Sequence, residues 1–252
     1  MSVDERMVHD IVQKVMANMQ ISGSVSGMHG VFKDMNDAIN ASIEAQKKVC
    51  TMTLDQREQI ISLIRKKTHE NAEILANMGV NETGMGNVGD KILKHHLTAD
   101  KVPGTEDIST IAWSGDRGLT LVEMGPFGVI GAITPATNPS ETVICNCIGM
   151  LAGGNTVVFN PHPNAKKTTI YTINMINEAS IEAGGPDNIA VTVEAPTLDT
   201  SAIMMKHPSI HLLVATGGPG VVTAVLSSGK RAIGAGAVSY THLRAHETSQ
   251  DL

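Results

Sequence analysis

The sequence is poor in the residue types on which several classes of protein depend. Aromatic residues make up 2% of the 252 residues, and only three cysteines are present, at Cys50, Cys145 and Cys147. Scarce aromatic residues leave few platforms on which the bases of single-stranded nucleic acid could stack. An odd cysteine count, with one C-x-C pair and no second cluster, argues against a disulfide framework and against a zinc site.

An excess of basic charge and long apolar runs are lacking as well. The 19 Lys and Arg residues against 25 Asp and Glu residues give a net charge of −6, which disfavours a general nucleic-acid binder. No apolar run reaches the length of a membrane span, and residues 1–20 lack the uninterrupted apolar stretch of a secretory signal. We therefore expect no nucleic-acid partner, no membrane partner and a reducing cytoplasmic location.

The N-terminal segment has the pattern of an amphipathic helix followed by a flexible linker. Within residues 1–20, Ser2 and Glu5 have the spacing of a capping box, and six apolar residues share one helical face: Val8, Ile11, Val12, Val15, Met16 and Met19. Residues 21–27 have the composition of a linker. The pattern predicts a peptide that docks on a partner, with a first helix packed on its own domain as the alternative.

Hydrophobic periodicity predicts an α/β fold for the rest of the chain. Helices are expected at about 34–49 and 54–78, the latter with a capping box at Thr53 and Gln56. Strand-like segments at 119–123 and 129–133, with a turn at 125–126, are expected next. Apolar strands then alternate with helices, the strands at 128–134, 156–159, 188–193 and 211–215, the helices at 140–151, 166–182, 198–206 and 221–228. This alternation predicts a doubly wound parallel sheet preceded by helices, with ligands beyond the carboxyl ends of the strands.

Two loops between predicted strands and helices carry the strongest candidates for chemistry. Asn138, in Thr134-Pro-Ala-Thr-Asn-Pro-Ser140, is held between prolines and could donate its amide to a developing oxyanion; the alternative is a plain loop with Ser140 as N-cap. Thr216-Gly-Gly-Pro-Gly220 combines backbone N–H groups with the positive end of a helix, which favours a phosphate; the alternative is a tight turn.

The remaining candidates are a histidine and the cysteines. His162, in Asn160-Pro-His-Pro163, could bind a nucleotide or a carboxylate group, with a rigid turn as the alternative. Cys145 and Cys147 are expected inside a helix among aliphatic residues, and Cys50 at a helix end, where a thiolate is disfavoured. None of the three is predicted to be a nucleophile. His242 and His246 have helical spacing but no third ligand nearby, so no metal site is predicted.

Several motifs are informative together: Glu82-Thr-Gly-Met-Gly86, Gly118-Leu-Thr-Leu-Val-Glu123, the segments 128–139 and 152–163, Thr216-Gly-Gly and Gly234-Ala-Gly-Ala237. These motifs resemble the aldehyde dehydrogenase superfamily. They are most similar to its CoA-acylating branch, the acetaldehyde and propionaldehyde dehydrogenases of bacterial microcompartments. The resemblance covers about residues 28–237, and residues 1–20 look like the encapsulation peptide of that branch.

The resemblance implies oxidation of a short-chain aldehyde by NAD, through a cysteine thioester, to an acyl-CoA, with coenzyme A as co-substrate. It further implies a shell-protein partner for residues 1–20, a location inside a bacterial microcompartment, and a homo-oligomer built through strands near 119–133. The implied roles are Asn138 as oxyanion donor, Thr134, Pro135 and Ala136 beside the nicotinamide, Thr216, Gly217 and Gly218 at the pyrophosphate, and Asn160 and His162 near the adenosine.

The sequence departs from the family pattern in three places. Gly234 stands where hydrolytic relatives carry a glutamate base, and Asn160 stands where they usually carry lysine. The family's nucleophilic cysteine lies beyond Gly234-Ala-Gly-Ala237, whereas residues 238–252 look foreign to the fold. We therefore expect an NAD-binding domain over 28–237 without the catalytic domain, and no turnover. The alternatives are a non-catalytic cargo or assembly module and a hydrolytic aldehyde dehydrogenase.

Overall fold

The computed structural model describes residues 28–236 of the chain. The predicted helix at 1–20, the linker at 21–27 and the tail at 238–252 lie outside the described residues. Among residues 28–236, no helix combines the length and the apolar character that crossing a bilayer demands.

Three helices precede the main sheet strands in sequence. After the short strand β1 (Val31–Phe32) come α2 (Met35–Val49), α3 (Leu54–Thr83) and α4 (Val88–Lys101). The predicted capping box is present, since the Thr53 side chain accepts from Gln56 N and the Gln56 side chain accepts from Thr53 N. Helix α3 runs further than predicted and ends at Gly84, whose φ of 68° is left-handed and favours glycine.

The predicted doubly wound parallel sheet is confirmed. Within residues 28–236 its six strands lie in the order β1-β6-β5-β4-β7-β8, and every pairing among them is parallel. The strands are β4 (Val129–Thr134), β5 (Thr156–Pro161), β6 (Ala190–Val193), β7 (Ile210–Thr216) and β8 (Arg231–Ala235), and the helices between them are α5 (Pro139–Ala152), α6 (Lys166–Glu182), α7 (Leu198–Lys206) and α8 (Pro219–Leu226). Strands β1 and β8, at the two edges, were not predicted.

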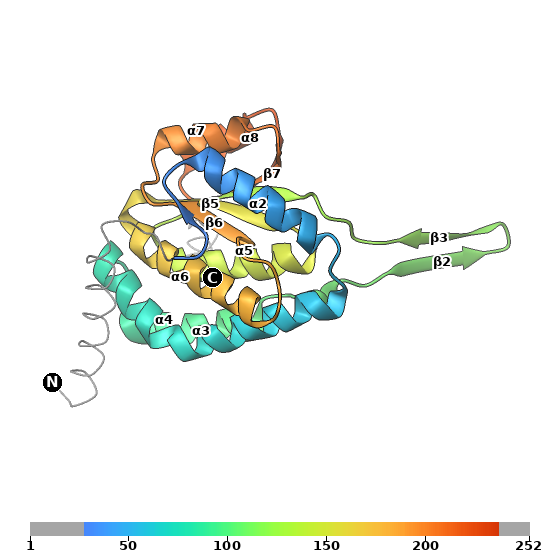
Figure 1. The fold of residues 1–252 in the computed structure, drawn as a ribbon, viewed down its shortest axis with the longest axis horizontal. Coiled ribbons are helices and arrows are strands. Elements are labelled where there is room, and N and C mark those ends of the chain that lie inside the picture. The colour runs from blue at the N-terminus through green and yellow to red at the C-terminus, as the bar shows by residue number, and fades with distance from the viewer. Residues whose placement is uncertain (1–27, 237–252) are drawn as a thin grey trace, which may run out of the picture.

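Two hydrophobic cores lie on opposite faces of this sheet (Figure 1). Helices α5 and α6 cover one face, with α3 and α4 packed outside them, and α2, α7 and α8 cover the other face. In β5, Val157 and Phe159 belong to the first core, whereas Val158 belongs to the second. Burial on both faces explains why the strands are continuously apolar in sequence.

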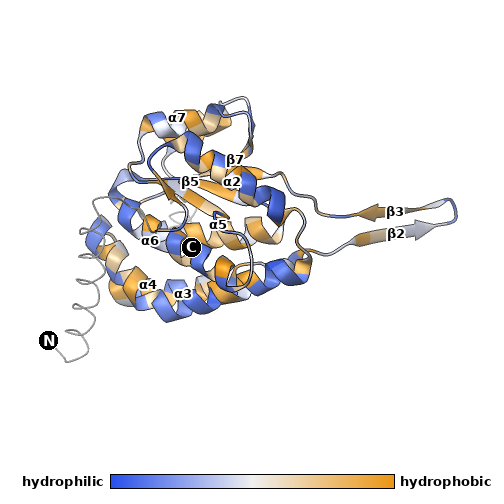
Figure 2. Cartoon of the chain, in the orientation of Figure 1, coloured by the Kyte–Doolittle hydropathy of each residue, from blue (hydrophilic) through white to orange (hydrophobic). Residues whose placement is uncertain are grey.

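The predicted hairpin was placed wrongly. Strands β2 (Ile111–Gly115) and β3 (Gly118–Val122) pair in antiparallel fashion around a two-residue turn and project from the body (Figure 1). The segment 129–133, predicted as the partner of 119–123, belongs instead to β4 at the centre of the main sheet. Both faces of the hairpin are exposed, and Figure 2 shows apolar residues along it. Because neither face is buried, its strands lack the alternation of apolar and polar residues by which a half-buried strand is predicted.

Candidate functional site

A cavity of about 520 Å³ opens at the carboxyl ends of the parallel strands. From β4 the chain continues to β5 on one side, while β7 lies on the other side of β4. Ligands of doubly wound folds bind at such a reversal of strand order. Five segments line the cavity: Ile133–Thr137 at the end of β4 and beyond it, Pro161–Pro163 at the end of β5 and beyond it, Thr197, Leu198 and Ser201 at the start of α7, Thr216–Gly218 at the end of β7 with Val221 of α8, and Ala235–Gly236 at the end of β8.

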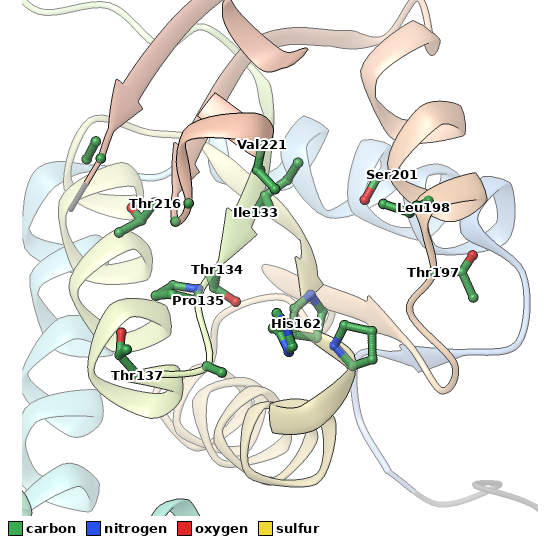
Figure 3. A pocket seen from close by; sticks show the side chains of 17 residues that line it. Ile133, Thr134, Pro135, Thr137, His162, Thr197, Leu198, Ser201, Thr216 and Val221 are labelled. Carbon is green, nitrogen blue, oxygen red and sulfur yellow. The ribbon is translucent and has the colours of Figure 1, made fainter. Parts of the chain in front are cut away.

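Seven of the nine residues predicted for the site line this one cavity. They are Thr134, Pro135, Ala136, His162, Thr216, Gly217 and Gly218. Figure 3 shows several of them converging from different strand ends. The two loops on which the prediction depended, after β4 and after β7, therefore face the same space. Asn138 and Asn160 are not part of the lining.

The loop after β4 presents an unsatisfied polar atom beside the cavity. Thr134 is 2% exposed, and its Oγ1 has no hydrogen-bond partner among the described residues. The Thr134 carbonyl, in contrast, accepts from His162 N at 3.0 Å, which joins the ends of β4 and β5. The buried hydroxyls of Thr169 and Thr192, which do not line the cavity, also lack a partner among the described residues, so the unpartnered Thr134 hydroxyl does not by itself indicate a ligand.

Asn138 directly follows the lining residue Thr137 and is the N-cap residue of α5, with Pro139 in the first helical position. It is half-buried, and its Oδ1 lies 3.4 Å from Lys94 Nζ. The alternative with Ser140 as N-cap is wrong, because Ser140 lies inside the helix with 1% of its surface exposed. Its Oγ lies 2.8 Å from His95 Nε2.

A buried polar cluster beneath this loop was not predicted from the sequence. Lys91 of α4 donates to the Thr137 carbonyl at 2.9 Å and lies 3.3 Å from Glu141 Oε1. His95, one turn further along α4, is fully buried, and this burial lowers its pKa. Lys91, His95 and Thr98 recur at helical spacing on the buried side of α4. In sequence, polar residues at that spacing normally indicate a solvent face, so the pattern is not informative alone.

The N-terminus of α8 is built to receive an anion. Gly218 is its N-cap residue, no side chain caps it, and no acidic residue lies in its first turn. A Cβ added to Gly217 or Gly218 would meet nothing within 4 Å, and both residues face the cavity. Gly217 N already donates to the Ala235 carbonyl at 3.1 Å, and Pro219 has no N–H, so the amides of Gly218 and Gly220 are the ones left for a ligand. Together with the positive end of the helix dipole, these two amides favour a phosphate at this position.

The other helix N-termini near the cavity already have negative or capping partners. The amides of Lys167 and Thr168 at the start of α6 donate to the Glu82 carboxylate at 2.7 and 2.8 Å. Helix α7 has a capping box at Thr197 with Asp199 in its first turn, and α5 carries Glu141 there. An anion in this cavity is therefore best accommodated by α8.

His162 and Asn160 differ in what they offer. The exposed His162 lines the cavity, and its Nδ1 accepts from Asn164 N at 3.2 Å, which leaves Nε2–H as the donor of the neutral ring. Asn160 is 3% exposed, and its side-chain amide bonds to Thr200 Oγ1 at 2.7 Å and Ser201 Oγ at 2.5 Å. Its amide is thus occupied in holding the start of α7 against the end of β5.

None of the three cysteines lines the cavity. Cys147 is buried, which raises its pKa to about 12, and burial also raises the pKa of Cys145. Cys50 is exposed at the C-terminal end of α2. Within the described part of the chain, no three potential metal ligands gather into a site.

Gly234 has a packing role that the sequence did not reveal. It does not line the cavity, and a Cβ there would lie 2.6 Å from Val222 Cγ1. Close packing of α8 on β8 is thus sufficient to explain glycine at this position. The absence of a glutamate at position 234 is accordingly a weaker argument about the reaction than the sequence suggested.

Comparison with known proteins adds to this geometry. The sequence profile of the aldehyde dehydrogenase family matches residues 17–237. The chain is 46% identical over 227 residues to an acetaldehyde dehydrogenase (acetylating) of Bilophila wadsworthia, and the match covers 86% of this chain and 46% of that protein. The chain spans about half the length of the curated relatives it matches.

Two solved structures share this architecture. A propionaldehyde dehydrogenase from the Clostridium phytofermentans fucose utilisation bacterial microcompartment has a TM-score of 0.82 at 73% identity, with 83% of this chain and 48% of that chain covered. A propionaldehyde dehydrogenase of Rhodopseudomonas palustris, solved with bound propionyl-CoA, has a TM-score of 0.80 at 50% identity, with 82% of this chain and 46% of that chain covered.

Proposed function

The chain belongs to the aldehyde dehydrogenase family, and we propose that it forms the nucleotide-binding part of a CoA-acylating aldehyde dehydrogenase. The reaction is the oxidation of a short-chain aldehyde, such as acetaldehyde or propionaldehyde, to its acyl-CoA. The names of the relatives, which include an acetylating acetaldehyde dehydrogenase and an enzyme solved with propionyl-CoA, support this reaction class over a hydrolytic one.

One observation carries the proposal: the uncapped N-terminus of α8 opens into the cavity at the reversal of strand order. Gly217 and Gly218 leave room there for the backbone to approach a pyrophosphate. Thr134, Pro135 and Ala136, at the end of β4 and directly after it, line the same cavity. This arrangement fits a dinucleotide that spans the ends of β4 and β7.

The residues around the cavity would divide the work of binding and positioning. Gly217 and Gly218 would hold the pyrophosphate, Thr134 to Ala136 would lie beside the nicotinamide, and His162 Nε2–H would donate toward the adenosine end. NAD, when bound, supplies the hydride acceptor of the reaction. Asn138 would donate its amide N–H to the substrate oxygen as negative charge develops there.

Titration of the 252-residue chain with NADH tests the proposal. We expect enhanced nicotinamide fluorescence on binding, and competition by ADP-ribose, which shares the pyrophosphate but lacks the nicotinamide. With NAD, CoA and propionaldehyde we expect no NADH production, because no cysteine of the described residues lines the cavity. Absence of NADH binding would refute the proposal for the cavity, and NADH production would refute the expectation of no turnover.

Location and assembly form a separate part of the proposal. One relative is, by its description, from a bacterial microcompartment, which supports the same location for this protein and a shell-protein partner for residues 1–20. A reporter fused to residues 1–20 should enter microcompartments, and diffuse signal in shell-expressing cells would count against docking. The exposed Trp113, Leu119 and Leu121 of the hairpin support a homo-oligomer, which size-exclusion chromatography would detect.

A further inference from the structure

Helix α4 delivers a buried ammonium group to the loop that lines the cavity. The side chains of Lys91 and Glu141 are 3% and 7% exposed, and their charged atoms lie 3.3 Å apart. Lys91 Nζ also donates to the Thr137 carbonyl at 2.9 Å. A charge is rarely buried to this extent unless it is paired, and here the ammonium contacts both a counter-ion and a backbone carbonyl.

The surroundings of Lys91 are shaped to its side chain. A Cβ added to Gly86 would lie 3.4 Å from Lys91 Cε, and one added to Gly79 would lie 3.8 Å from Lys91 Cδ. Both distances are ordinary van der Waals contacts, so these positions pack against the lysine stem, and the positive φ of 78° is the feature that favours glycine at Gly86.

The loop that Lys91 holds has few other attachments. At its start, the Thr134 carbonyl accepts from His162 N at 3.0 Å. Among residues 28–236, the bond from Lys91 Nζ is the one hydrogen bond made to Pro135, Ala136 or Thr137. All three of these residues line the cavity, and Asn138 follows directly.

Stability alone does not account for this arrangement. A buried ion pair contributes little net stability, and an apolar pair of similar volume often replaces it without loss. An apolar pair, however, has no donor for the Thr137 carbonyl. Lys91 therefore supplies a hydrogen bond to the Thr137 carbonyl that an apolar side chain cannot supply.

We propose that Lys91, with Glu141 as its counter-ion, is a positioning residue that fixes the 135–137 loop, and with it Asn138, in the conformation that binds the nucleotide. The inference rests on the proposed function, because the loop is assigned to the nicotinamide side of the cavity. It predicts that nucleotide affinity depends on the hydrogen bond that Lys91 donates to the Thr137 carbonyl, and not on the folding stability that the Lys91–Glu141 ion pair contributes.

Four variants of the 252-residue chain separate these two effects, each measured by thermal unfolding and by NADH titration well below its melting temperature. Lys91→Met leaves a buried carboxylate unpaired and should lower both Tm and affinity. Lys91→Met combined with Glu141→Leu should recover much of the Tm but keep NADH binding about tenfold weaker than in the unsubstituted chain, called the parent here.

Glu141→Gln keeps the lysine donor, so its Tm should fall while its NADH affinity stays within about twofold of the parent. Ile64→Ala, in the core beneath α3 and away from the cavity, is the matched control that should lower Tm without changing affinity.

The outcomes distinguish this inference from the proposed function. Parent-like NADH affinity in the double variant, or a loss in Glu141→Gln as large as that in the double variant, would overturn the positioning role. Should Lys91→Met fail to fold, the double variant and Glu141→Gln still decide the question. Absence of NADH binding by the parent chain would instead overturn the proposed function.

Discussion

Replacing Gly218 by aspartate should raise folding stability and, in the same protein, weaken nucleotide binding about a hundredfold. Gly218 is the N-cap residue of α8 with φ −67° and ψ 159°, which any residue can adopt, and a Cβ there meets nothing within 4 Å. No side chain caps α8 in the parent. Aspartate is better than glycine at an N-cap by a few tenths of a kcal/mol, and replacing glycine at a φ and ψ that any residue adopts also restricts the unfolded chain. Together these effects should stabilise Gly218→Asp by up to about 1 kcal/mol and raise Tm by roughly 2–4 °C.

The same carboxylate would occupy the position proposed for the pyrophosphate. It would accept from the amides at the start of α8 and bring a negative charge close to a bound phosphate. For two unit charges about 5 Å apart at an effective dielectric constant of about 20, the repulsion is on the order of 3 kcal/mol, which corresponds to roughly a hundredfold rise in Kd. NADH titration by fluorescence and thermal unfolding of the same samples measure the two effects.

Gly218→Asn is the matched control, because asparagine has nearly the same shape and caps a helix equally well but carries no charge. It should raise Tm in the same way and weaken NADH binding by no more than about tenfold, so that the difference between the two variants isolates the charge. Parent-like NADH affinity in Gly218→Asp would show that no phosphate binds at α8 and would refute the assignment of the site.

Three further outcomes are expected. Iodoacetamide should alkylate the exposed Cys50 in the native protein but reach Cys147, whose burial raises its pKa to about 12, only after unfolding; peptide mapping that finds native Cys147 alkylated would contradict the packing of α5. Burial lowers the pKa of His95, so the unfolded state takes up the proton more readily, and stability is kept above the unfolded pKa of about 6.5 and lost as the pH falls below it. Between pH 7 and pH 5 the Tm of the parent should therefore fall more steeply than that of His95→Gln, and equal slopes would count against a buried neutral histidine. Asn138→Ala should leave Tm and NADH affinity nearly unchanged, because Asn138 lies outside the cavity lining; an affinity loss of about tenfold would mean that Asn138 contacts the nucleotide itself.

Local sequence signals were sufficient to predict the bounds of helices that local interactions begin and end. Helices α6 and α7 begin and end where they were predicted; a capping box at Thr197 begins α7, and Gly184 in a left-handed conformation follows α6. Strand β8, Arg231–Ala235, was not predicted, because its small residues have little strand preference and only its pairing with β7 defines it.

The composition of the site was predictable for a topological reason. In a doubly wound sheet the carboxyl ends of neighbouring strands meet at one edge, so the loops containing Thr134 and Thr216 share a cavity although they are distant in sequence. The contact between Lys91 and Glu141 has no comparable rule. It joins residues 50 positions apart and depends on how α4 packs against α5. The residues next to Lys91 and Glu141 in sequence give no sign of this packing, so the contact could not be predicted from the sequence.

Glycine shows most clearly what a sequence motif leaves undetermined. Gly84 lies at a left-handed helix end that disfavours other residues, and Gly234 leaves room for Val222 of α8. Gly217 and Gly218 have neither constraint, since their φ angles are ordinary and a Cβ would meet only open space. A residue type that the fold does not require, at a position that faces a cavity, is best explained by what enters the cavity. A glycine turn is therefore assigned to binding because its glycines face a cavity and are not required by the backbone or by packing, and the number of glycines in the loop does not decide the assignment.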